Sequence, residues 1–118
     1  MLEKDIEKQL KRKVESRIPG AMCMKFVSPG ISGVPDRMIL LPYGVVVFVE
    51  LKRPGEVLRP LQRCIVERMR KIGQTVFEVD NPYKVDILVL WLEDVMTAMD
   101  RLEPVPPVPE SLSGGVAL

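Results

Sequence analysis

Residues 45–52 place two charged side chains at the end of a segment that otherwise predicts a buried strand. Five apolar residues come first, and Glu50 and Lys52 follow them. Because side chains alternate along a strand, Glu50 and Lys52 share one face, with their Cα atoms about 6.5–7 Å apart. A carboxylate on a buried strand is costly unless a partner compensates its charge. Taken alone, this pair is explained most simply as an ion pair that serves stability.

Asp36 is the third charged residue of interest, because a hairpin is expected to bring it opposite Glu50. If residues 42–44 (Pro-Tyr-Gly) form a three-residue loop, Leu41 faces Val45, and counting outward pairs Asp36 with Glu50. Directly opposed residues point to the same side of a sheet, with Cβ atoms about 4.5–5.5 Å apart. A loop one residue longer or shorter would turn Asp36 to the opposite face.

Two carboxylates and a lysine that converge in this way suit metal-assisted chemistry on a phosphodiester. Neighbouring carboxylates repel each other unless one is protonated or a cation lies between them. Oxygen ligands suit Mg²⁺, which binds few protein carboxylates and keeps several waters. Such an ion can stabilise charge on a phosphodiester and help to activate a water, and Lys52 can orient that water or neutralise the transition state.

The loop at residues 28–35 directly precedes Asp36 and contains Gly30 and Gly33. Two interpretations of this loop stay open. The glycines let the backbone approach a ligand closely, or the segment is a simple connecting turn.

The composition excludes several other chemistries. The 118 residues include no His, which rules out Ser-His-Asp triads and His metal sites. The net charge of +1, from 17 basic and 16 acidic residues, is no general sign of nucleic-acid binding, so the clusters of basic residues either contact DNA or are solvated helix faces. Cys23 and Cys64 are too few for a disulfide framework and predict free thiols in a reducing compartment. We find no membrane span and no secretion signal, and we expect a cytoplasmic protein.

Apolar periodicity and turn residues predict an α/β fold in the order helix, three strands, helix, strand, helix. A strand–helix–strand crossover predicts a parallel pair, and the hairpin adds antiparallel neighbours. The result is a mixed sheet of about four strands with helices on its faces. The expected elements are a helix at 2–17, strands at 21–27, 36–41 and 45–52, a helix at 59–72, a strand at 75–79 and a helix at 82–100.

The last predicted helix is unusually apolar, so it is either sandwiched in the core or forms a subunit contact. From Glu103 onward, four prolines and then Ser-Leu-Ser-Gly-Gly predict a flexible segment. We therefore divide the chain into a domain at residues 1–101 and a flexible Pro/Gly-rich tail at residues 102–118.

At this point the sequence resembles a known family. Pro35-Asp36 followed by Glu50-Leu51-Lys52 has the form of the PD-(D/E)XK nuclease signature, and the wider pattern resembles the VRR-NUC subgroup. This resemblance spans about residues 3–90 and implies a restriction-endonuclease-like core. The D…ExK motif alone is weak, whereas the full set in order is strong. The matching stretches are Glu3-x-x-Ile6-x-x-x-Leu10, Lys25-Phe26-Val27-Ser28-Pro29-Gly30, Gly33-Val34-Pro35-Asp36-Arg37, Val49-Glu50-Leu51-Lys52 and Pro60-Leu61-Gln62.

The resemblance implies roles for the central residues. Asp36 and Glu50 would be ligands of Mg²⁺ or Mn²⁺, and the Leu51 carbonyl would contribute to the same ion. Lys52 would be the catalytic lysine.

Two further residues match the family with alternatives left open. Glu3 matches an acidic residue of the first helix that reaches toward the metal, but it is also explained as a solvated carboxylate, and Glu7 is a rival for the role. Gln62 matches a glutamine that lines the active site, the alternative being an exposed polar residue early in its helix.

The function implied by the resemblance is a metal-dependent DNA endonuclease that hydrolyses phosphodiester bonds. Several members prefer branched DNA such as Holliday junctions or flaps, and a homodimer is common. The small size fits a stand-alone member of phage or bacterial type, acting in a bacterial or phage-infected host cytoplasm. Two alternatives stay open: a non-cleaving DNA-binding or replication/repair assembly module on a nuclease fold, and a structural protein in which Glu50 and Lys52 form only an ion pair.

Overall fold

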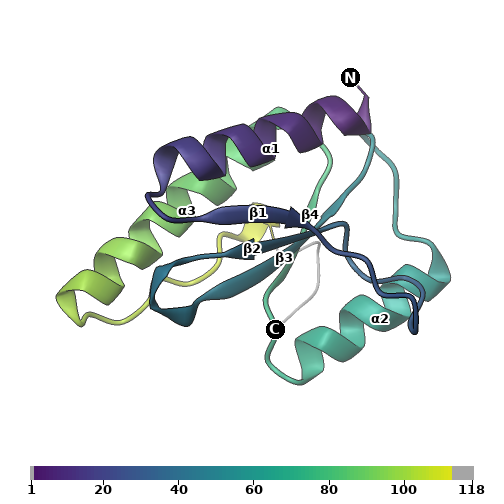
Figure 1. The fold of residues 1–118 in the computed structure, drawn as a ribbon. Helices are drawn as coiled ribbons and strands as arrows, with labels where there is room; N and C mark the ends of the chain where they lie inside the picture. Colours follow the sequence, from purple (N-terminus) through teal and green to yellow (C-terminus); the bar gives the residue numbers. More distant parts are fainter. Residues whose placement is uncertain (1, 113–118) are drawn as a thin grey trace.

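A four-stranded mixed sheet separates the helices into two layers (Figure 1). The structure is a computed structural model that describes residues 2–112. Every predicted helix and strand is present, with ends within two residues of the predicted ones. The elements are α1 (Glu3–Arg17), β1 (Met22–Lys25), β2 (Arg37–Leu40), the 3-10 helix η1 (Pro42–Gly44), β3 (Val46–Leu51), α2 (Pro60–Lys71), β4 (Val76–Val79), α3 (Pro82–Arg101) and the 3-10 helix η2 (Glu110–Leu112).

The strands lie in the order β1-β2-β3-β4, with β3 in the interior of the sheet. The pairs β1–β2 and β2–β3 are antiparallel, and β3 runs parallel to β4. The parallel pair confirms the prediction from the crossover through α2, because a parallel connection needs a helix or other long segment to return the chain. The mixed α/β sheet predicted from the sequence is therefore the observed one.

The main core lies on the face of the sheet that α1 and α3 cover. Ile6, Leu10 and Val14 recur every fourth residue on α1 and are completely buried. Most apolar residues of α3 are buried in the same cluster, although Leu90 stays 54% exposed. The apolar sequence of α3 is thus explained by burial within its own domain. None of the helices among the described residues combines the length and apolar character needed to cross a membrane.

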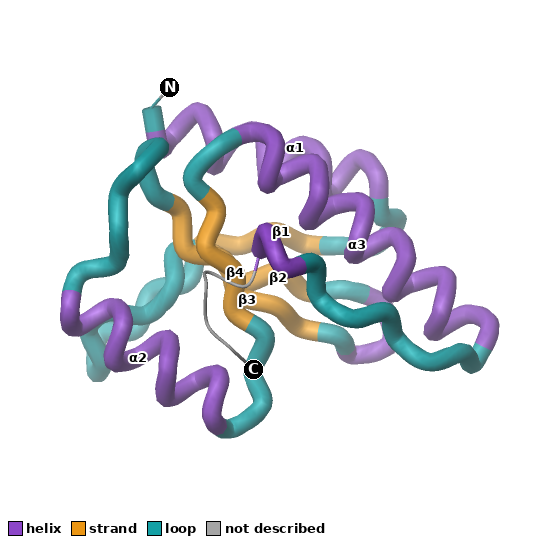
Figure 2. Tube along the Cα trace, turned by 180° about the vertical axis from the view of Figure 1, so that it is seen from behind, coloured by secondary structure: helices purple, strands orange, loops and turns teal. Residues whose placement is uncertain are grey.

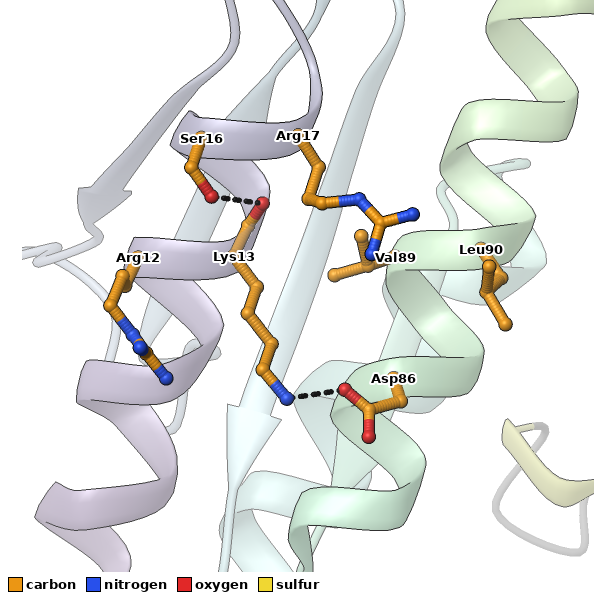
Figure 3. A pocket seen from close by; sticks show the side chains of 7 residues that line it. All are labelled: Arg12, Lys13, Ser16, Arg17, Asp86, Val89 and Leu90. Atoms are coloured by element: carbon orange, nitrogen blue, oxygen red, sulfur yellow. Dashed lines mark hydrogen bonds and ion pairs between the residues drawn. The ribbon is translucent and has the colours of Figure 1, made fainter.

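The two helices of this layer lie side by side, as seen from behind in Figure 2. Ion pairs join them at the surface, between Lys13 and Asp86 and between Arg17 and Glu93, the latter at 2.9 Å. A hollow of about 470 Å³ lies between the helices, and Figure 3 shows Lys13 reaching across it to Asp86. Asp86 is the single acid among the residues that line this hollow, so it does not offer a carboxylate metal site.

The opposite face carries the smaller layer, which α2 covers. Leu58 and Val66 are buried there against Val76 of β4, with Phe48 and Met69 packed around them. Because side chains alternate along β3, Phe48, Glu50 and Lys52 point to this second face. The charged residues of the ExK motif therefore lie on the α2 side of the sheet.

The segment after α3 differs from the predicted boundary at residue 101. Leu102 adopts a left-handed conformation (φ 54°), which ends α3 and turns the chain back. The indole N–H of Trp91 donates to the Pro106 carbonyl at 3.1 Å, and Leu112 is completely buried in the main core. The packed domain thus extends to residue 112, because a buried indole needs an acceptor and an apolar side chain gains by burial. The remainder of the predicted tail, residues 113–118, lies outside the described residues.

Candidate active site

The register of the β2–β3 hairpin decides which way Asp36 points. Met38 pairs with Phe48, and Arg37 pairs with Val49. One further step along this ladder sets Asp36 opposite residue 50, as the count from a three-residue loop predicts. The hairpin register is therefore confirmed, and it directs Asp36 and Glu50 to the same face of the sheet.

Backbone hydrogen bonds hold Asp36 at the end of the sheet. The Leu51 N–H donates to Asp36 Oδ2 at 2.9 Å, and the Phe26 N–H donates to the Asp36 carbonyl at 2.8 Å. The Lys52 N–H donates in the other direction, to the Val79 carbonyl of β4 at 3.0 Å. A trans peptide holds its C=O opposite to its N–H, so the Leu51 carbonyl points away from β4, toward the side where Asp36 lies.

Glu50 is a buried acid, with a side chain that is 1% exposed. Neither of its carboxylate oxygens receives a hydrogen bond from the residues that the structure describes. Burial is the main cause that raises the pKa of Glu50 to about 8, and the adjacent Asp36 carboxyl raises it further. The Lys52 ammonium, with Nζ 3.8 Å from Glu50 Oε2, lowers the pKa but does not offset these effects. The Glu50 side chain therefore lacks a sufficient positive partner among the residues that the structure describes.

Lys52 is held in place by Gln62 of α2. The Lys52 ammonium donates to Gln62 Oε1 at 2.8 Å, and the same oxygen accepts the Arg59 N–H at 3.0 Å. Because Gln62 lies in the first turn of α2, it links Lys52 to the start of that helix. The sequence-predicted residues Asp36, Glu50, Lys52 and Gln62 thus gather at one end of the sheet.

The two candidate acids of α1 differ in their surroundings. Glu7 Oε2 accepts a hydrogen bond from Arg37 Nε at 3.0 Å, and Arg37 also donates to the Cys23 carbonyl at 3.1 Å. Partial burial and then the charge of Asp36 raise the pKa of Glu3, while Lys52 lowers it. Glu3 thus lies within electrostatic range of Asp36, whereas Glu7 already has a basic partner.

The donor set fits a hard divalent cation that keeps part of its water shell. Across residues 2–112, no three Asp, Glu or Cys side chains are close enough together to form a ready metal site. Two carboxylates and the Leu51 carbonyl are nevertheless the oxygen donors that Mg²⁺ binds with few protein ligands. The two unpaired oxygens of Glu50 beside Asp36 are the observation that fits a cation, because buried polar atoms are otherwise nearly always paired.

Glu78 of β4 is a neighbour of Glu50 that sequence reasoning missed. The parallel register pairs Glu50 with Glu78, so both side chains point to the same face on strands about 4.8 Å apart. Arg70 compensates Glu78 with Nη1 at 3.5 Å from Oε2, and two hydrogen bonds to the Val76 carbonyl hold Arg70 itself. A single acid within the apolar segment 76–79 is the sequence signal that could have indicated this position.

Gly33 explains the role of the loop at residues 28–35. Its φ is +89°, and a Cβ at this position would lie 2.9 Å from the Leu61 carbonyl oxygen at the start of α2. Glycine is therefore required for a close contact between the loop and α2. A Cβ at Gly30 would meet nothing within 4 Å among the described residues, so the close approach in this loop is that of Gly33 to α2.

The mixed sheet, with an acid ahead of its second strand and Glu-x-Lys at the end of its third, defines a nuclease of restriction-endonuclease-like fold. No protein-family model matches the sequence. The chain is 44% identical over 79 residues to "Putative nuclease p44" of Acyrthosiphon pisum secondary endosymbiont phage 1, covering 67% of this chain and 83% of that protein. A solved structure described as "VRR_NUC domain" matches with a TM-score of 0.69 and 36% identity, over 75% of this chain and 94% of that one. The chain belongs to the VRR-NUC nucleases.

Proposed function

We propose that this nuclease is an endonuclease that hydrolyses DNA phosphodiester bonds with the help of Mg²⁺ or Mn²⁺. The observation that carries the proposal is the buried Glu50 carboxylate, whose two oxygens have no hydrogen-bond partner among the described residues. Asp36 lies beside it, and the Lys52 ammonium is close by. A purely structural ion pair does not need a second acid next to Glu50.

In this proposal Asp36, Glu50 and the Leu51 carbonyl hold the cation at the end of the β2–β3 pair. When bound, the cation stabilises negative charge on the phosphodiester and lowers the pKa of a water. A bound cation would also offset the repulsion between the two carboxylates, which allows Glu50 to ionise near neutral pH. Glu3, whose pKa the nearby charge of Asp36 raises, is the acid of α1 that we assign to the same ion.

Lys52 acts on the scissile phosphate itself. Its ammonium is positioned to donate to a phosphate oxygen or to the attacking water, and thereby to stabilise the charge that develops in the transition state. Gln62 accepts a hydrogen bond from one N–H of Lys52 and leaves the other two N–H donors available, so it orients Lys52 without neutralising it. We therefore assign catalysis to Lys52 and a positioning role to Gln62.

Branched DNA, such as Holliday junctions or flaps, is the substrate class that we favour. We further propose a homodimer, because symmetrical resolution of a junction requires two cuts. Since α3 uses most of its apolar residues inside its own domain, it offers little apolar surface for that contact. The likeness to a phage protein supports an activity in a bacterial or phage-infected host cytoplasm.

A cleavage assay tests the proposed function. Wild type, Asp36→Asn and Asp94→Asn are incubated with labelled four-way junction, flap and duplex DNA in Mg²⁺, in Mn²⁺ and in EDTA. Asp94 is a matched control, because it is exposed on α3 and its side chain has no hydrogen bond or ion pair within residues 2–112. We expect cleavage by wild type and Asp94→Asn with either metal, none in EDTA, and a loss of about 100-fold or more in Asp36→Asn.

The other outcomes contradict the proposal in distinct ways. Cleavage in EDTA, or full activity of folded Asp36→Asn, would remove the metal-dependent mechanism. Binding of branched DNA without cleavage by wild type would indicate the non-cleaving module. Neither binding nor cleavage of DNA would indicate a structural protein. Circular dichroism of each variant shows whether a loss of activity reflects unfolding.

A further inference from the structure

Lys52 lies between Asp36, on the β2 side, and a pocket on the β4 side. This pocket is smaller than the hollow between α1 and α3. Its volume is about 200 Å³, which exceeds that of several waters at about 30 Å³ each. Lys52 belongs to the candidate active site and also lines this pocket, so the two sites share a wall. The lining residues come from α2, β4, α3 and the loops beside them, and the charged ones are Lys52, Glu56, Arg63, Glu78, Asp80 and Lys84.

Three acids and three bases line this pocket, and all but one of them have a partner of opposite charge. Each of the three acids has a basic partner: Glu56 with Arg53 at 3.6 Å, Glu78 with Arg70 at 3.5 Å, and Asp80 with Lys84 at 3.1 Å. Lys52 is itself paired with Glu50 at 3.8 Å, so Arg63 is the charged residue of the lining that is left over. The exposed Arg63 side chain has no hydrogen bond or ion pair with any residue in the described part of the chain. Its guanidinium is therefore available to an anion from solution.

The helix that orients Lys52 also presents Arg63 to the pocket. Gln62 accepts a hydrogen bond from the Lys52 ammonium, and Arg63 is the next residue of α2. Successive phosphates of one DNA strand are only about 3.4 Å apart along the helix axis. A strand that has its scissile phosphate at Lys52 and runs toward β4 would therefore bring a neighbouring phosphate close to the pocket that Arg63 lines.

We propose that Arg63 binds a backbone phosphate next to the scissile one and so sets the register of the DNA strand across Lys52. This inference rests on the proposed function, since it assumes that DNA reaches Lys52. A guanidinium suits the task, because its planar donors match two phosphate oxygens at once. The contact is with the backbone, so it adds affinity without sequence preference.

DNA binding in EDTA tests the inference without cleavage. Fluorescence anisotropy gives the Kd of labelled duplex and four-way junction between 50 and 200 mM salt for wild type, Arg63→Gln, Arg63→Lys and Arg12→Gln. Arg12 is the matched control, because it is an exposed arginine in the α1 layer without a partner among residues 2–112. We expect Arg63→Gln to raise Kd about 5–10-fold on both DNAs and to reduce the salt slope by about 1.

The two other variants complete the pattern. Arg63→Lys keeps the charge and should retain the wild-type salt slope with a smaller rise in Kd, while Arg12→Gln should stay within about twofold of wild type. Equal effects of Arg63→Gln and Arg12→Gln, or wild-type binding by Arg63→Gln, would overturn the inference. If the wild-type protein cleaves DNA but one of these two binding results is found, the proposed function still stands and only the inference about Arg63 fails. Loss of all DNA binding and cleavage by wild type would overturn both.

Discussion

Glu50 combines two properties that an ordinary structural carboxylate does not have. Its oxygens are buried without a hydrogen-bond partner among the described residues, and its pKa is raised from 4.5 to about 8. A raised pKa means that the folded chain keeps a proton that the unfolded chain releases as pH rises above about 4.5. The contribution of Glu50 to the free energy of unfolding of the metal-free protein therefore falls as pH rises from about 4.5 to 8.

Glu50→Gln removes this titration and should stabilise the metal-free protein at alkaline pH. We expect the free energy of unfolding of the variant to exceed that of wild type by on the order of 3 kcal/mol at pH 8, and by little near pH 4.5. Urea denaturation in EDTA at both values measures the difference. Glu67→Gln, an exposed α2 residue without a partner within residues 2–112, is the control and should show no such pH dependence.

A difference between Glu50→Gln and wild type that stays constant with pH would show that Glu50 is not held in its protonated form. Metal addition offers a separate readout. Millimolar Mg²⁺ should stabilise wild type against urea and should stabilise Glu50→Gln less, because a ligand that binds only the folded state raises its stability.

At the scale of the elements, the orientation of Lys52 depends on the packing of the loop at residues 28–35 against α2. Gly33 approaches the Leu61 carbonyl, and Leu61 immediately precedes the Gln62 that binds Lys52. A side chain at Gly33 would push the loop and the first turn of α2 apart. The position of the lysine therefore depends on a contact between two elements that are joined through β2 and β3.

Gly33→Ala should be destabilising for two reasons. The φ of +89° disfavours any L side chain, and the new Cβ would meet a backbone oxygen at 2.9 Å. We expect a loss of about 2 kcal/mol or more in the free energy of unfolding, together with reduced cleavage. Gly30→Ala in the same loop has open space and should change stability by less than about 0.5 kcal/mol. Similar denaturation midpoints for both variants would contradict the assigned contact.

At the scale of the whole molecule, the segment after α3 completes the core. Leu112 is completely buried, although it follows a proline-rich stretch that predicts a flexible tail. Its burial closes the main core beside α3 and β4. The folded unit is thus larger than the part of the chain that matches known nucleases by sequence.

Leu112→Ala should accordingly destabilise the domain by about 2–5 kcal/mol, which is the usual cost of truncating a buried leucine. Val105→Ala, at a half-exposed position of the same segment, should cost less than about 1 kcal/mol. Thermal melts of the two variants distinguish a packed segment from a flexible one. Equal melting temperatures for Leu112→Ala and wild type would place residue 112 outside the core.

The sequence by itself determined the element order, the faces of the strands and the convergence of Asp36 with Glu50. These are local properties. Periodicity over a few residues reveals which face is apolar, and the length of the hairpin loop sets the register by simple counting. The meeting of two acids 14 positions apart could therefore be predicted before the sheet was seen.

Only the tertiary structure decided which residues surround those two acids. The pairing of Glu7 with Arg37, the proximity of Glu78 to Glu50, the contact of Gly33 with α2 and the burial of Leu112 each join segments that lie far apart in the sequence. Such contacts depend on how whole layers pack against each other. Which elements become neighbours is decided by the burial of apolar surface summed over the whole core. A pattern over a few residues does not predict this sum, so the residues around the site could be identified only from the tertiary structure.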